Sequence, residues 1–201
     1  RGPAFRRPLR HRAIRSSIDR RNPLQRVWRT APPCPAYPTA SGCALPRTLR
    51  SPTAGSELAV SLVRGRSVVS ASQSASPLRL LASAGGGHAA WVYQSSLGGG
   101  FIGRDHVALR VEVAEGASLF LSSQASTKVY RATRSRFSLD ASVAAGGVLV
   151  AWPDPVACFA GASFDQTQRF ALGRGASLLV VDAYTAGRIA RGERWAFERL
   201  A

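Results

Sequence analysis

The stretch VAEGASLFL, residues 113–121, contains the pattern that decides the fold. Val113, Gly116 and Leu119 lie three positions apart, with an apolar segment on each side of the glycine. Glycine is the residue that a tight turn needs where φ is positive. The stretch therefore predicts a strand, a turn at Gly116 and a second strand.

The same pattern of strand, glycine turn and strand recurs in LVRGRSVVS (62–70), VAAGGVLVA (143–151) and LGRGASLLV (172–180). Gly116, Gly146 and Gly175 fall 30 and 29 residues apart, which indicates a structural repeat. Units of this kind bury their apolar faces by stacking on one another. We therefore expect an all-β fold of stacked antiparallel hairpins, similar to a β-helix or solenoid-like sandwich, with few helices. An ordinary antiparallel sandwich with coincidental spacing is the alternative.

Strands are also indicated by apolar residues at every second position in three segments, 58–62, 107–113 and 137–143. This period of two is typical of half-buried strands. The continuous apolar run SLLVVDA (177–183) predicts a strand buried on both faces. In the last segment, 184–201, the alternation of Trp195 and Phe197 predicts a further strand, and we expect the domain to continue beyond Ala201.

Positive charge is concentrated in the first quarter of the chain. The 201 residues carry a formal net charge of +16, and residues 1–50 contain 12 arginines against one acid, Asp19. This segment also holds eight of the 12 prolines, so we expect it to be disordered. Its composition leaves open an organelle transit peptide, sequence foreign to the mature protein, or nonspecific attraction to RNA or a membrane surface. Residues 51–201 are expected to form the β domain, and no apolar run is long enough to span a bilayer.

Motifs of catalytic and zinc sites are missing from the sequence. Lys128, the only lysine among 27 basic residues, completes neither a Ser-x-x-Lys nor a Walker motif. GGGFIG (98–103) matches GxGxxG, but a strand-like segment follows where a dinucleotide site needs a helix. The carboxylates are spread singly, and the cysteines and histidines lack the spacing of zinc ligands. For Glu193, which lies among several arginines, an ion pair is the default interpretation. We therefore expect a protein that is not an enzyme.

Five segments, in order along residues 57–200, resemble the urease accessory protein UreD (UreH) family. The most specific is SSQASTKVYR (122–131), which is similar to a Thr-Gln-Ala-x-Thr-Lys-Val-Tyr-Arg segment of the family. The others are PLRLL (77–81), GGGFIGRDHVAL (98–109), AWPDPVACFAGASFDQ (151–166) and TAGRIARGERWAF (185–197). The resemblance implies a β-helical stack of strands, in agreement with the repeat described above.

The resemblance also implies a function. Members of the family are non-enzymatic scaffolds and metallochaperones for nickel urease, which bind apo-urease and recruit the accessory protein UreF and the GTPase UreG. It implies that nickel is a transient cargo, that no cofactor is tightly bound, and that neither a specific nucleic acid nor a membrane is a partner. A cytoplasmic location is implied, while organelle targeting by residues 1–50 stays open. A basic RNA- or surface-binding β protein, acting through the Arg-rich tail, is the alternative from another class.

The matched motifs supply the candidate site residues. Asp105 matches the aspartate of the family's Gly-Asp segment and Glu193 the glutamate of its Gly-Glu segment. Both are candidates to line a nickel passage, since loosely held nickel suits oxygen ligands. Arg104 replaces a glycine that usually precedes the aspartate, and would be strained if that position requires a positive φ. Twelve further motif residues are expected to serve structure or partner binding: Gly99, Gly100, Gly103, Gln124, Thr127, Lys128, Tyr130, Arg131, Pro153, Asp154, Gly187 and Arg188.

Overall fold

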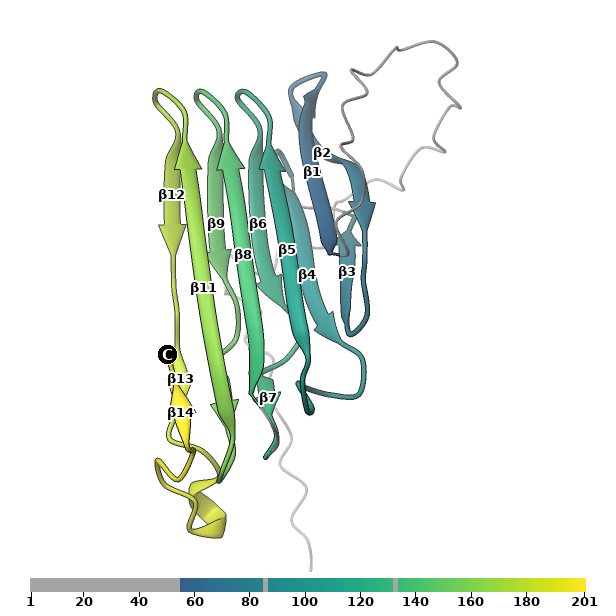
Figure 1. The fold of residues 1–201 in the computed structure, drawn as a ribbon. Coiled ribbons are helices and arrows are strands. Elements are labelled where there is room, and N and C mark those ends of the chain that lie inside the picture. Colours follow the sequence, from purple (N-terminus) through teal and green to yellow (C-terminus); the bar gives the residue numbers. More distant parts are fainter. Residues whose placement is uncertain (1–54, 85–86, 132–133) are drawn as a thin grey trace, which may run out of the picture. The chain divides into compact units, whose positions relative to one another are not determined.

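A computed structural model describes residues 55–84, 87–131 and 134–201 (Figure 1). All of them belong to one unit, Leu49–Ala201. The expectations for residues 1–50, namely disorder, a transit peptide or attraction to RNA or a surface, concern residues that lie outside the described part of the chain. Among the described residues, no helix has the length and apolar character needed to cross a membrane.

Strands make up most of the described chain, and they form three sheets. The six-stranded sheet has the order β14-β11-β8-β5-β1-β2, with bounds Arg199–Leu200, Ser163–Leu172, Ser135–Val143, His106–Val113, Ser56–Val63 and Arg66–Gln73. The five-stranded sheet has the order β12-β9-β6-β4-β3, with bounds Ser177–Val180, Val148–Trp152, Ser118–Ser123, Ala90–Ser96 and Leu78–Ser83. The three-stranded sheet has the order β13-β10-β7, with bounds Tyr184–Thr185, Val156–Cys158 and Thr127–Val129. A 3-10 helix, η3, covers Ile189–Arg191.

The chain visits the three sheets in turn, so that each circuit is one coil of a solenoid. The coils are β5-β6-β7, β8-β9-β10 and β11-β12-β13, and corresponding strands lie side by side (Figure 1). Val107 pairs with Phe137 and Leu119 with Leu149, each 30 residues further on. The glycine spacing seen in the sequence is therefore the length of one coil. The expected all-β, solenoid-like fold is confirmed.

The expected antiparallel pairing across the glycine turns is wrong for the coils. Gly116, Gly146 and Gly175 have φ of 64°, 63° and 69°, as a tight turn requires. Yet the strands that flank each of them enter two different sheets, and each strand pairs in parallel with its counterpart one coil away. Among the strands of the described residues, only β1–β2, joined through Gly65, and β3–β4 are antiparallel pairs. A glycine turn permits both arrangements, but parallel stacking lets the turns bond too, with Gly116 N donating to Ala145 O at 3.0 Å.

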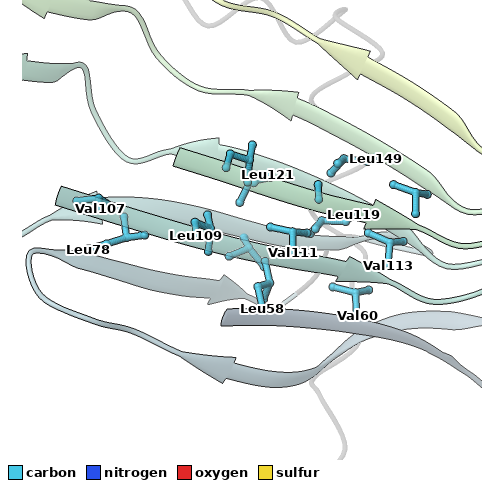
Figure 2. Close-up of a cluster of buried hydrophobic side chains, with 14 of the residues drawn as sticks. Leu58, Val60, Leu78, Val107, Leu109, Val111, Val113, Leu119, Leu121 and Leu149 are labelled. Carbon is cyan, nitrogen blue, oxygen red and sulfur yellow. The ribbon is translucent and has the colours of Figure 1, made fainter. Parts of the chain in front are cut away.

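The core fills the space between the two large sheets (Figure 2). Val107, Leu109, Val111 and Val113 point inward from β5, and none is more than 3% exposed. Leu119, Leu121 and Leu149 face them from β6 and β9. Side chains alternate between the two faces of a strand, so the polar residues between them lie on the outer face. The period of two read from the sequence is therefore confirmed for 107–113 and 137–143, whereas in 58–62 the last apolar residue, Leu62, is 46% exposed.

The expectation of a strand buried on both faces at 177–183 is wrong. The strand β12 ends at Val180 and, within the part of the chain that the structure describes, it is an edge strand that pairs only with β9. Leu178 packs against the core, whereas Leu179 points to the other face and is 49% exposed. The outer face of this sheet also exposes Trp91 and Trp152. Apolar side chains therefore lie on this face without a second layer that covers them.

The strand expected from Trp195 and Phe197 is also wrong. These residues precede β14 in a loop that follows η3. Gly187 and Gly192 adopt φ of 92° and 76°, and Trp195 itself has φ of 55°. Left-handed residues at these positions turn the backbone back on itself, so the apparent alternation of aromatic residues does not describe an extended segment.

Candidate functional site

A cavity of about 210 Å³ lies where the ends of β4, β6 and β7 approach β11. Apolar side chains line one part of it, namely Leu78, Phe101, Phe137, Val156 and Phe164. The other part is polar and includes Gln94, Ser123, Thr127, Lys128, Asp154, Gln166, Gln168 and Asp182. Apolar walls with a few convergent polar groups are typical of a ligand or transfer site. We refer to this space as the interior cavity.

Four of the family-like segments meet at the interior cavity, and the first of them, PLRLL, contributes Leu78. Gly99 comes from the glycine-rich segment, Thr127 and Lys128 from β7, and Pro153 and Asp154 from the segment after β9. Coil stacking explains this convergence, because it places residues about 30 positions apart on neighbouring rungs. The sequence reveals these segments but not their meeting point.

Asp154, which follows β9, is held in place by Ser123, the last residue of β6 in the preceding coil. Its backbone N donates to Ser123 Oγ at 2.7 Å, and Ser123 Oγ donates to Asp154 Oδ2 at 3.1 Å. Ser123 is 9% exposed, so this pair of hydrogen bonds is partly sheltered from water. The arrangement orients the Asp154 carboxylate with a neutral partner and leaves its charge uncompensated by that partner.

Asp182 belongs to a second polar group that the sequence analysis missed. Gln168 Nε2 donates to both carboxylate oxygens, at 2.9 and 2.8 Å, and Gln166 Nε2 donates to one of them at 3.2 Å. Gln166 and Gln168 pair with Phe137 and Leu139 of the preceding coil, so amides replace apolar side chains on the same face of the sheet. Aligning the 29-residue repeat would have revealed this substitution.

Lys128 contributes mainly through its backbone. Phe101 N donates to Lys128 O at 2.8 Å, and Tyr130 N donates to Phe101 O at 3.1 Å. A Cβ on Gly100 would overlap the Lys128 carbonyl oxygen, which explains the glycine at that position. The Lys128 side chain is exposed at the rim of the interior cavity. Gln124, which is also exposed, donates its backbone N to Gln94 O at 2.8 Å.

A second cluster contains four more of the predicted motif residues: Tyr130, Gly187, Arg188 and Glu193. Arg188 Nε donates to Glu193 Oε2 at 2.8 Å, and Arg188 Nη2 contacts Glu193 Oε1. Ala160 N donates to Glu193 Oε2 at 3.1 Å. The Arg188 guanidinium lies 4.2 Å from the centre of the Phe159 ring, which Tyr130 meets edge-on. We refer to this group as the Arg188–Glu193 cluster, and it confirms the ion-pair interpretation of Glu193.

The Arg188–Glu193 cluster makes stability depend on pH. Hydrogen bonding to Arg188, and then to Ala160 N, holds the pKa of Glu193 below its usual value. A depressed carboxyl pKa stabilises the fold above the unfolded-state pKa, and this contribution is lost as the pH falls through the folded-state pKa. Glu193→Gln should therefore flatten the acid side of a plot of unfolding free energy against pH, as measured by urea unfolding between about pH 5 and 2.

The matched control for this prediction is Glu198→Gln. Glu198 is exposed and lies in none of the ion pairs formed among the described residues. The Glu198→Gln substitution should leave the slope of the unfolding free energy against pH, on the acid side, close to that of the wild type. Equal flattening by both substitutions would contradict the role given to the Arg188–Glu193 cluster.

Cys158 lies beside this cluster but is chemically quiet. It is 2% exposed, and burial raises the pKa of its thiol to about 11. At neutral pH the thiol is therefore protonated, and the thiolate form that binds metals or attacks electrophiles is rare. Its backbone carbonyl oxygen has a structural role, because it lies so close to Gly187 that a Cβ there would be 3.1 Å from it.

Asp105 caps a turn in a basic neighbourhood. Ile102 N donates to Asp105 Oδ2 at 2.7 Å, and Gly103 of the same turn has φ of 66°. Four basic side chains share the surrounding space of about 260 Å³: Arg104, His106, Arg134 and Arg136. Among the described residues, positive φ at a residue other than glycine occurs only at Arg64 and Trp195. Arg104 is therefore not strained in the way that its glycine counterpart suggested.

The structure does not gather the two nominated acids into one site. Asp105 bonds within the turn before β5, whereas Glu193 belongs to the Arg188–Glu193 cluster. In residues 55–84, 87–131 and 134–201, no three side chains of His, Cys, Asp or Glu come close enough to hold a metal ion together.

The motif residue Arg131 has an exposed side chain whose carbons pack beside Gly161.

Comparison with known proteins identifies similar sequences over nearly all of the described chain. A family model described as "UreD urease accessory protein" matches residues 53–201. A urease accessory protein UreD of Sorangium cellulosum is 53% identical over 154 residues, which cover 76% of this chain and 49% of that protein. A urease accessory protein D of Arabidopsis thaliana is 36% identical over 149 residues, covering 71% of this chain and 51% of that protein. The chain spans about half the length of the curated relatives it matches.

Proposed function

The chain belongs to the UreD family of urease accessory proteins, and we propose that it acts as a non-catalytic scaffold in the maturation of nickel urease. The observation that carries this proposal is the family match over residues 53–201, together with 53% identity to a protein named as a urease accessory protein. The proposed place of action is the cytoplasm. The proposed partners are apo-urease and the accessory proteins UreF and UreG, which the chain would bridge.

The proposed cargo is nickel, which would pass through the interior cavity without being held tightly. Nickel accepts carboxylate, amide and water oxygens as ligands, and a sparse set of them releases the ion more readily than a closed Cys/His cage. Asp154 and Asp182 meet this requirement, because their hydrogen-bond partners in the described chain are neutral hydroxyl and side-chain amide groups. Neither belongs to an ion pair formed among the described residues.

Asp105 and Glu193 remain proposed as acids that line the nickel passage, but their surroundings differ from those of Asp154 and Asp182. The Arg188 guanidinium pairs with Glu193. Asp105 forms none of the ion pairs among the described residues, but the hollow beside it is lined by arginines. Nickel could bind Glu193 only after Arg188 moved away, and at Asp105 it would meet the positive field of the neighbouring arginines, so both roles are more costly than those of Asp154 and Asp182. We therefore rank the two cavity aspartates first among the proposed nickel contacts.

The experiment for this ranking measures nickel per urease active site after maturation with variants of the full chain. Asp154→Asn with Asp182→Asn should lower the nickel content while the chain still co-purifies with apo-urease. Asp140→Asn is the control, because Asp140 lies exposed on the outer face of β8 and bonds only Arg169 among the described residues. Unchanged nickel in the double variant would exclude the cavity aspartates. Failure of the wild-type chain to co-purify with apo-urease would contradict the scaffold role itself.

A further inference from the structure

Uncharged side chains hold both acids of the interior cavity. Ser123 Oγ accepts a hydrogen bond from Asp154 N at 2.7 Å and donates to Asp154 Oδ2 at 3.1 Å. Gln168 Nε2 lies 2.9 and 2.8 Å from the two carboxylate oxygens of Asp182, and Gln166 Nε2 lies 3.2 Å from Oδ1. Arginines pair instead with three other acids, namely Asp140, Asp165 and Glu193. The cavity acids are therefore oriented without a neighbouring cation.

The two glutamines interrupt an apolar face of the stack. Gln166 and Gln168 pair in register with Phe137 and Leu139 of β8, whose side chains pack in or against the core. An amide at such a position gives up apolar burial and needs hydrogen-bond partners of its own. The Asp182 carboxylate supplies an acceptor for both amides. Support of Asp182 therefore explains these glutamines, whereas packing of the core does not.

The adjacent residues Ser122 and Ser123 show the same distinction. Ser122 Oγ donates to Trp152 O at 2.6 Å, and Ser123 bonds Asp154, so each serine ties β6 to the following coil. Only Ser123 lines the interior cavity and reaches an acid, and it is 9% exposed. The Ser123 hydroxyl therefore does more than join two coils.

These hydrogen bonds leave room for a cation on each acid. A carboxylate offers about four acceptor sites. Among the described residues, side-chain donors occupy one site on Asp154 and three on Asp182. Hydrogen bonds that orient a metal-binding side chain typically change metal affinity by about 10- to 100-fold. The bonds from the serine and the glutamines can therefore control how well the two acids bind an ion.

We infer that Ser123, Gln166 and Gln168 are positioning residues for a divalent cation in the interior cavity. They fix the orientation of Asp154 and Asp182, and none of them brings a positive charge that the ion would have to displace. The inference rests on the proposed function for the identity of the ion, nickel, and for the two aspartates as its contacts. It adds that the ion depends on three side chains that need not touch it.

The test titrates Ni²⁺ alone into the purified full chain and measures binding by equilibrium dialysis. Ser123→Ala and Gln168→Leu should each weaken Ni²⁺ binding by about 10-fold. Ser123→Thr retains the hydroxyl and should stay within about 3-fold of the wild type. Leucine is the residue that β8 has at the position paired with Gln168, so Gln168→Leu is compatible with the stack.

The matched controls are Ser122→Ala and Thr167→Val. Ser122 also bonds the following coil, and Thr167 lies exposed between the two glutamines. Each control should change Ni²⁺ binding less than about 3-fold. A merely structural role is separated by adding Ser123→Ala to Asp154→Asn, where it should cause no further loss because the acid that it orients is gone. A further loss of about 10-fold in that background would overturn the positioning role.

The remaining outcomes separate this inference from the proposed function. If Asp154→Asn with Asp182→Asn weakens Ni²⁺ binding while Ser123→Ala and Gln168→Leu bind as the wild type does, the positioning role is overturned and the two nickel contacts stand. Equal loss in Ser122→Ala and Ser123→Ala would also overturn it. Equal binding by the wild type and every variant, the double aspartate variant included, would overturn both the positioning role and the cavity as the nickel route.

Discussion

Gly187→Ala is expected to lower the free energy of unfolding by about 3 kcal/mol or more. Gly187 has φ of 92°, a conformation that costs a residue with a side chain energy even in open space. Here a Cβ would also lie 2.6 Å from Glu193 O and 3.1 Å from Cys158 O. Both are backbone atoms, so relief requires the turn and the preceding coil to separate, and the Arg188–Glu193 cluster would be disturbed with them.

The control for this substitution is Gly146→Ala. Gly146 has φ of 63°, but nothing lies within 4 Å of the position that a Cβ would take. Only the backbone term applies, so the expected loss is about 1 kcal/mol. Urea unfolding of the full chain, monitored by circular dichroism, measures the loss of unfolding free energy in both variants. Equal losses for the two variants would mean that the close approach at Gly187 is not a constraint.

Leu149→Ala should destabilise the fold by about 2–5 kcal/mol. Leu149 is fully buried, and it pairs with Leu119 of the preceding coil and Leu178 of the following one. Removing three carbons from the middle of this column opens a cavity that rigid neighbouring rungs cannot fill. Because the coils are stabilised by their contacts with adjacent coils, the loss should affect the whole stack.

Leu179→Ala provides the matched comparison within the same sheet. The residue type is the same, but Leu179 is 49% exposed on the outer face of β12. Its replacement should change the unfolding free energy by about 0.5 kcal/mol or less. If Leu179→Ala were as damaging as Leu149→Ala, the assignment of inner and outer faces would be wrong for β12.

The repeat length and the inner faces of the strands could be predicted from the sequence because they depend on local pattern. The 30-residue interval between Gly116 and Gly146 is one coil, and the alternation in 107–113 matches the buried face of β5. The partner of each strand could not be predicted, since a glycine turn is compatible with pairing across the turn or with pairing one coil away. The exposure of Leu179 could not be predicted either, because an apolar sequence does not tell whether another layer covers it.

Some features of the candidate site could be predicted from the sequence. The motif segments were recognised, and the ion pair of Glu193 follows from its arginine-rich surroundings. The interior cavity could not be derived, because Thr127, Asp154 and Asp182 become neighbours only through coil stacking. The lone lysine of SSQASTKVYR lies in β7, and its backbone carbonyl, which accepts a hydrogen bond from Phe101 N, explains more of the local structure than its ammonium group does.

The most direct test of the account measures nickel in urease purified from cells that express the urease subunits with UreF and UreG, with and without this chain. The scaffold role predicts nickel near the full occupancy of the urease sites when the full chain is present, and only trace nickel when it is omitted. The same low nickel content with and without the chain would contradict the assignment of this protein to urease maturation.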